Sequence, residues 1–67
     1  MITIQVNHEL KSIEQQTSLE SLLNILKISL KGIAVAINNQ IITKSAWNST
    51  LLNENDNVTI IQATQGG

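Results

Sequence analysis

A stripe of leucines along one face of a predicted helix constrains the fold of this chain more than any other feature. Thr17 opens the helix, and Glu20 follows three residues later, which is the spacing of a capping box. The apolar positions then recur at i, i+3, i+4 and i+7, as one helical face requires: Leu19, Leu22, Leu23 and Leu26. A chain of 67 residues without cysteine forms one domain with an aliphatic core. The helix must therefore bury its leucines against strands from the rest of the chain.

Short apolar segments on both sides of the helix predict those strands. Ile2, Ile4 and Val6 alternate with polar residues, the period of a half-buried strand. The run 33–37 is continuously apolar, which favours a central strand covered on both sides or along most of one. Turns are expected at 7–9 and at Asn38-Asn39, because asparagine tolerates positive φ. Strands are predicted at residues 1–7, 10–13, 33–37, 40–43 and 58–63, with a short helical turn at 45–48 and a polar loop at 53–57.

The order of these elements predicts an α+β fold of the β-grasp (ubiquitin-like) type. One α-helix would cross a mixed sheet of four to five strands, with the two terminal strands parallel at its centre. Parallel neighbours need a crossover connection, and the segment that joins the terminal strands contains the helix. We expect a domain over residues 1–64 and a flexible Gly-Gly tail over 65–67.

Charge and composition exclude several classes of function. The formal net charge is −1, the basic residues are scattered lysines, and Trp47 is the one aromatic residue. Nucleic-acid binding needs a basic stripe and usually stacking aromatics, so we expect none. The chain has neither an apolar run of membrane-spanning length nor a signal-peptide pattern. A soluble protein is expected, in the cytoplasm or, if plastid-encoded, in the stroma, with no membrane partner.

The side chains offer little for catalysis. His8 is the single histidine and is expected to be a solvated turn residue. Glu54 and Asp56 share a loop but lack metal-ligand spacing, and loop acids are usually solvated. Lys44 is able to steer an acidic partner, although a lone lysine more often serves solubility. Trp47 fits an interface hot spot or, more readily, a core position. We expect no catalytic residue, no metal and no bound cofactor.

The sequence ends in Gln65-Gly66-Gly67. Two glycines end a chain by chance about once in two hundred cases. Without Cβ atoms, such an end can thread into a narrow slot and present an unhindered carboxylate. The tail is the remaining candidate for chemistry.

The whole chain resembles the ThiS family, the sulfur carrier proteins of thiamine biosynthesis. The matching segments are 1–7, 34–38, Lys44-Ser45-Ala46-Trp47, 52–56, 58–63 and the terminal Gly66-Gly67. Family members tend to have glycine where this chain has His8 and Asn39, and Asp-Gly-Asp where it has Glu54-Asn55-Asp56. These departures concern turns, and the tail is intact.

The resemblance implies a carrier and not an enzyme. An E1-like adenylyltransferase would use ATP to adenylate the Gly67 carboxylate. A persulfide sulfur donor would then displace AMP to give a thiocarboxylate, and thiazole synthase would receive the sulfur. Docking is expected through the tail and the sheet face near the last strand, where the adjacent pairs Ile41-Ile42 and Ile60-Ile61 must each turn one member outward. That member either faces a partner or is covered by other parts of the chain. The predicted partner-contacting residues are Gly66, Gln65, Thr64, Gln62, Ile60 and Ile42.

Three alternatives remain open from the sequence. They are a sulfur carrier for molybdopterin or tRNA thiolation, a ubiquitin-like protein modifier, and a β-grasp interaction domain without carrier chemistry. Deleting the two glycines separates the last from the others.

Overall fold

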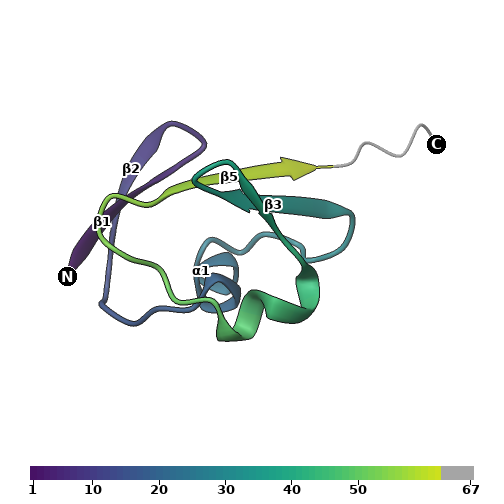
Figure 1. Ribbon diagram of the computed structural model, residues 1–67, viewed down its shortest axis with the longest axis horizontal. Helices are drawn as coiled ribbons and strands as arrows, with labels where there is room; N and C mark the ends of the chain where they lie inside the picture. Colours follow the sequence, from purple (N-terminus) through teal and green to yellow (C-terminus); the bar gives the residue numbers. More distant parts are fainter. Residues whose placement is uncertain (63–67) are drawn as a thin grey trace.

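The computed structural model describes residues 1–62, and their elements follow the predicted order (Figure 1). They are β1 (Ile2–Val6), β2 (Glu9–Ile13), α1 (Leu19–Ile25), β3 (Ile33–Ile37), β4 (Gln40–Ile42), the 3-10 helix η1 (Lys44–Ser49) and β5 (Asn57–Gln62). The predicted extension of the last strand to Ala63 lies outside the described residues, as does the predicted boundary between residues 64 and 65.

The strands form one mixed sheet in the order β2-β1-β5-β3-β4. β5 lies at its centre and runs parallel to β1, with Gln5 opposite Asn57 and Val6 opposite Val58. The other neighbours pair antiparallel. One face of the sheet is crossed by α1 (Figure 1). The predicted β-grasp fold and its parallel central strands are confirmed.

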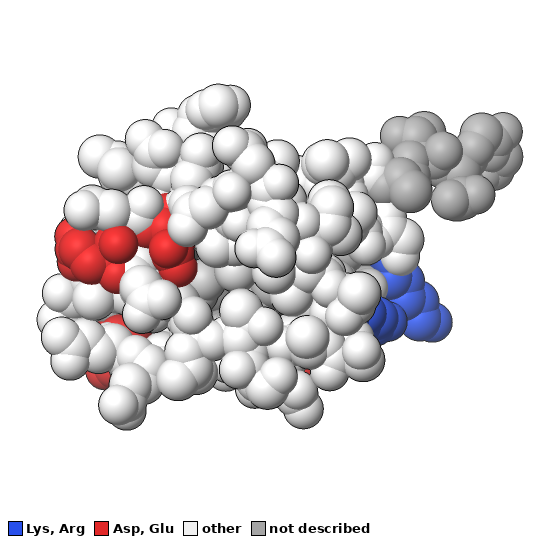
Figure 2. Space-filling view, viewed as in Figure 1, with Lys and Arg blue, Asp and Glu red and all other residues white. Residues whose placement is uncertain are grey.

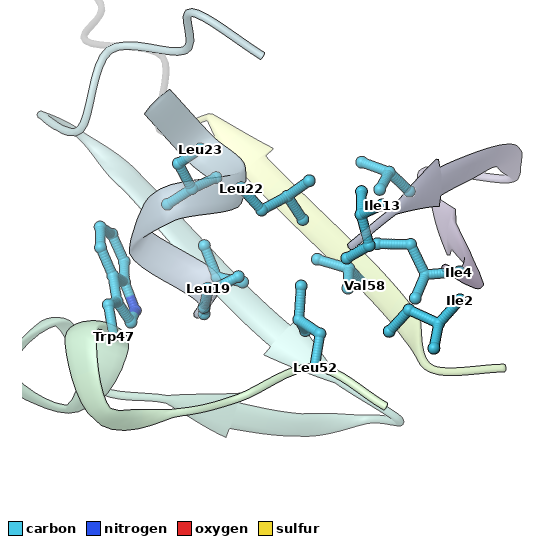
Figure 3. Close-up of a cluster of buried hydrophobic side chains, with 11 residues drawn as sticks. Ile2, Ile4, Ile13, Leu19, Leu22, Leu23, Trp47, Leu52 and Val58 are labelled. Atoms are coloured by element: carbon cyan, nitrogen blue, oxygen red, sulfur yellow. The ribbon is translucent and has the colours of Figure 1, made fainter. Parts of the chain in front are cut away.

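The leucine stripe forms the middle of the core. Leu19, Leu22 and Leu23 are completely buried and pack with inward-facing side chains of the sheet (Figure 3). Trp47 closes this core from η1, and its indole Nε1 donates a hydrogen bond to the Ile42 carbonyl at 2.9 Å. Trp47 is therefore a core residue, as the sequence favoured.

The helix cap differs from the prediction by one residue. Ser18 is the N-cap, and its hydroxyl accepts from the Ser21 amide at 3.1 Å. The Thr17 hydroxyl instead donates to the Glu14 carbonyl, and the Thr17 carbonyl accepts from the Leu52 amide. Both residue types can cap a helix. The contact with the segment before β5 occupies Thr17 and shifts the cap to Ser18.

Both hairpin turns adopt positive φ without glycine. The turn between β1 and β2 has φ of 50° at Asn7 and 74° at His8, and the turn between β3 and β4 has 53° at Asn38 and 71° at Asn39. Positive φ at both central residues defines the hairpin turn whose twist matches the flanking strands. His8 is exposed in its turn, as predicted.

The burial difference along α1 gives the first prediction. Leu22→Ala should lower the free energy of unfolding by about 3 kcal/mol, because it leaves a cavity in a fully buried site. Ile25→Ala is the matched control on the same helix, since Ile25 is 62% exposed, and should change stability by about 0.5 kcal/mol or less. Chemical denaturation measures both. Equal losses would contradict the assignment of the core face.

Candidate functional site

The outer face of the sheet, opposite α1, carries an apolar patch next to the last strand. Ile41 on β4 and Ile61 on β5 are 63% and 53% exposed. The register places Ala34 beside Ile61 and Ala36 beside Ile41. These four residues, named the outer-face patch below, are contiguous across three strands. No other segment of residues 1–62 covers the two isoleucines.

The inward members of the two isoleucine pairs are Ile42 and Ile60. Both are half-buried and pack against the core. The reason is the register, which places both opposite Val35, a completely buried residue. Directly opposed residues point to the same face of a sheet. The exposed members are therefore Ile41 and Ile61 rather than the pair chosen from the sequence, and partner contact through Ile42 or Ile60 stays a prediction.

The strand that leads to the tail ends at the rim of the sheet. Gln62 is exposed and pairs with Ile33, the first residue of β3. The remaining predicted tail residues, namely Thr64, Gln65, Gly66 and Gly67, lie outside the described residues, so their roles stay predictions.

The side-chain amide of Asn7, at the end of β1, binds β5 with hydrogen bonds like those that a strand residue makes through its backbone. Its side-chain oxygen accepts from the Ile60 amide at 2.8 Å, and its side-chain nitrogen donates to the Ile60 carbonyl at 3.2 Å. Its own backbone amide donates to the Val58 carbonyl at 2.9 Å. The positive φ of Asn7 turns the main chain away, and the side-chain amide continues the parallel ladder in its place. The sequence indicated only a turn residue here, because nothing local shows that β5 lies alongside.

The opposite end of β5 is held by Asp56, which is 8% exposed. Its carboxylate accepts from the Asn38 side-chain nitrogen at 3.0 Å and from the Asn53 amide at 2.8 Å. The expectation of a solvated loop acid was wrong for this residue, because the loop folds back on the turn after β3. The neighbouring Glu54 is exposed and accepts from the Thr3 amide at 3.1 Å.

Within residues 1–62 there is neither a pocket nor a group of three or more His, Cys, Asp or Glu side chains able to hold a metal ion. Neither helix in this range combines the length and apolarity that crossing a bilayer requires. What these residues present is the outer-face patch, which includes Ile61 on the strand that precedes the tail.

Comparison with known proteins gives concordant results. The ThiS family model matches residues 4–67. The crystal structure of the thiamine biosynthesis protein ThiS from Geobacter metallireducens superposes with a TM-score of 0.85 at 20% identity, covering 98% of this chain and 100% of that one. The uncharacterized protein ycf40 of Porphyra purpurea is 36% identical over 66 residues, or 98% of this chain and 93% of the relative. Its counterpart from Pyropia yezoensis is 33% identical over the same shares.

The Asn7 contacts give a prediction for the base of the tail. Asn7→Gly keeps the positive φ but removes both side-chain hydrogen bonds to Ile60, and should cost about 1–2 kcal/mol of stability. The Ile60 amide should exchange with solvent faster, which NMR-detected hydrogen exchange measures. Asn39→Gly is the control, since Asn39 shares the positive φ and its side chain makes no hydrogen bond within residues 1–62. Unchanged Ile60 exchange in the Asn7 variant would show that the side chain does not secure β5.

Proposed function

The chain belongs to the ThiS family, and on that premise we propose that it is a sulfur carrier for thiamine biosynthesis. Its reactive group is the carboxylate of Gly67. The observation that carries the proposal is the family match itself, which extends through the terminal Gly-Gly. The arrangement of the sheet supports it, because the central strand β5 leads directly toward those residues.

The proposed chemistry begins with activation, because a carboxylate is a poor electrophile. An E1-like adenylyltransferase joins the Gly67 carboxylate to the α-phosphate of ATP and releases pyrophosphate. The terminal sulfur of a protein persulfide then attacks the acyl carbon, and AMP leaves with the bonding electrons. A thiol cleaves the remaining S–S bond, which leaves the thiocarboxylate on the carrier and a disulfide on the donor side. Thiazole synthase takes the sulfur from this thiocarboxylate.

The residues of the chain are compatible with this division of labour. The sequence contains no cysteine, so the terminal carboxylate is the group on which sulfur is carried. Gly66 lacks a Cβ, which lets the terminus pass a narrow entrance to the partner's site. The carrier supplies the acyl group and a docking surface, while ATP is bound by the activating partner.

The outer-face patch is the proposed docking surface for the activating enzyme. Ile61 lies one residue before the end of β5, so a partner that covers it also meets the start of the tail. An exposed apolar cluster is a common feature of protein contact sites. Hot spots of such contacts are large side chains that a partner can bury, and Ile41 and Ile61 are the large side chains of the patch.

Activation at the terminus has a direct test. With a cognate adenylyltransferase, the chain should support exchange of labelled pyrophosphate into ATP, because adenylation of Gly67 is reversible. A variant that lacks Gly66 and Gly67 should fold normally by circular dichroism and support no exchange. Exchange that persists in this variant would place the activated group elsewhere, and a full chain that supports no exchange would point to an interaction domain.

The docking surface has a separate test. Ile61→Asp and Ile41→Asp should each raise the KM for the carrier in the exchange assay about tenfold, since a charge would be buried at the interface. Leu10→Asp is the matched control, because Leu10 is 70% exposed and faces outward on the far edge strand β2. It should leave KM within about twofold. If all three substitutions raised KM equally, the outer-face patch would not be part of the interface.

A further inference from the structure

The charged side chains of this domain are separated along β5. In the view of Figure 2, the lysine atoms that are visible lie at the end of the domain where β5 finishes, and most of the visible acidic atoms lie at the opposite end. Lys11, on β2 beside Glu9, is apart from this basic end. The two acidic residues nearest β5 in sequence, Glu54 and Asp56, lie three residues and one residue before its first residue, Asn57. The small net charge of −1 therefore conceals a dipolar surface with its positive end at the base of the tail.

The sheet register explains how lysines from distant parts of the sequence reach this end. Lys31 lies two residues before Ile33, and Ile33 pairs with Gln62, the last residue of β5. Lys44 follows β4 by two residues, and β4 ends at Ile42 opposite Val35, so the chain leaves β4 toward the start of β3. Lys27 is in the same connection as Lys31, between α1 and β3. Lys44 is thus not the lone lysine that the sequence suggested.

These three lysines are available to a partner. All are exposed. Within residues 1–62 the one ion pair joins Lys11 and Glu9 at 3.6 Å, on the far edge strand, and it involves none of the three. A cluster of exposed like charges without internal partners repels itself, and a complementary surface relieves that repulsion.

We propose that Lys31 and Lys44, with Lys27 beside them, form a basic collar that docks on an acidic rim around the tail-binding slot of the activating enzyme. This inference rests on the proposed function and adds the charge of the partner's surface. The collar and the outer-face patch are near each other at the end of β5, since Lys31 lies two residues before Ile33, the partner of Gln62, and Ile61 is the residue before Gln62. The patch supplies apolar contact area, and the collar supplies orientation and a faster encounter.

The length of the segment that follows Gln62 determines which part of the partner lies next to the collar. Five residues follow Gln62, and a segment of that length spans at most about 17 Å. When the tail is drawn out into a slot, its base stays at the entrance while Gly67 reaches the nucleotide. The collar then faces protein side chains at the entrance, and the α-phosphate at the far end of the slot lies beyond its reach.

The test compares single charge reversals that change the net charge equally. Lys31→Glu and Lys44→Glu remove collar charges, and Lys11→Glu is the matched control on the opposite side of the sheet. In pyrophosphate exchange with the cognate adenylyltransferase at about 20 mM salt, each collar variant should lower kcat/KM about tenfold with kcat at saturation unchanged. Lys11→Glu should stay within about twofold. At about 0.5 M salt the collar effect should shrink below about threefold, because screening shortens the range of exposed charges.

Three results would overturn the proposal. If the collar variants have the same kcat/KM as Lys11→Glu at low salt while the wild-type protein is fully active, the collar proposal is contradicted and the proposed carrier function stands. If the wild-type protein supports no exchange, both the collar proposal and the proposed carrier function are contradicted. Concentration-dependent sedimentation of the wild type alone that Lys31→Glu abolishes would assign the lysines to a contact between copies of this chain. Circular dichroism of each variant separates these results from loss of folding.

Discussion

The parallel pairing of β1 with β5 is the interaction on which the rest of the structure depends. It places the last strand at the centre of the sheet, so that β3 and β4 can add on one side and β2 on the other. It requires a crossover between β1 and β5, and α1 lies on that connection and buries its leucines against the sheet. Because β5 is held by ladders on both sides, by Asn7 near its end and by Asp56 before its start, the tail begins from a fixed base.

The two faces of the sheet differ in burial because side chains alternate along each strand. The inward face, with Val35, Val58 and Ile60, completes a core that has no disulfide to assist it, since the sequence contains no cysteine. The outward face leaves Ile41 and Ile61 in solvent beside the strand that leads to the tail. A domain this small buries about 60% of the surface of its unfolded chain, so the core takes most of its apolar residues. Ile41 and Ile61 differ from the other exposed apolar side chains because they share one face of the sheet next to the start of the tail.

Local patterns in the sequence predicted the helix and the strands. The features that these patterns did not predict depend on pairing between distant segments of the chain. The leucine stripe and the alternation around Ile4 are local consequences of burial, and both were confirmed. The helix cap at Ser18 and the inward direction of Ile42 and Ile60 depend on contacts across the chain. The role of Asn7 required knowing that β5 lies beside it, and the basic collar required the register that brings Lys31 and Lys44 to one end. The tail could be proposed from the sequence alone, because the proposed chemistry involves only the last residues.

The central claim concerns one carboxylate, and intact-mass spectrometry tests it most directly. The full chain is incubated with ATP, the cognate adenylyltransferase and a persulfide donor, and the mass of the protein is then measured. Replacement of one oxygen by sulfur should add about 16 Da, and fragmentation should place the added mass on Gly67. A mass that stays unchanged with a partner of proven activity, or a sulfur found on any other residue, would contradict the account.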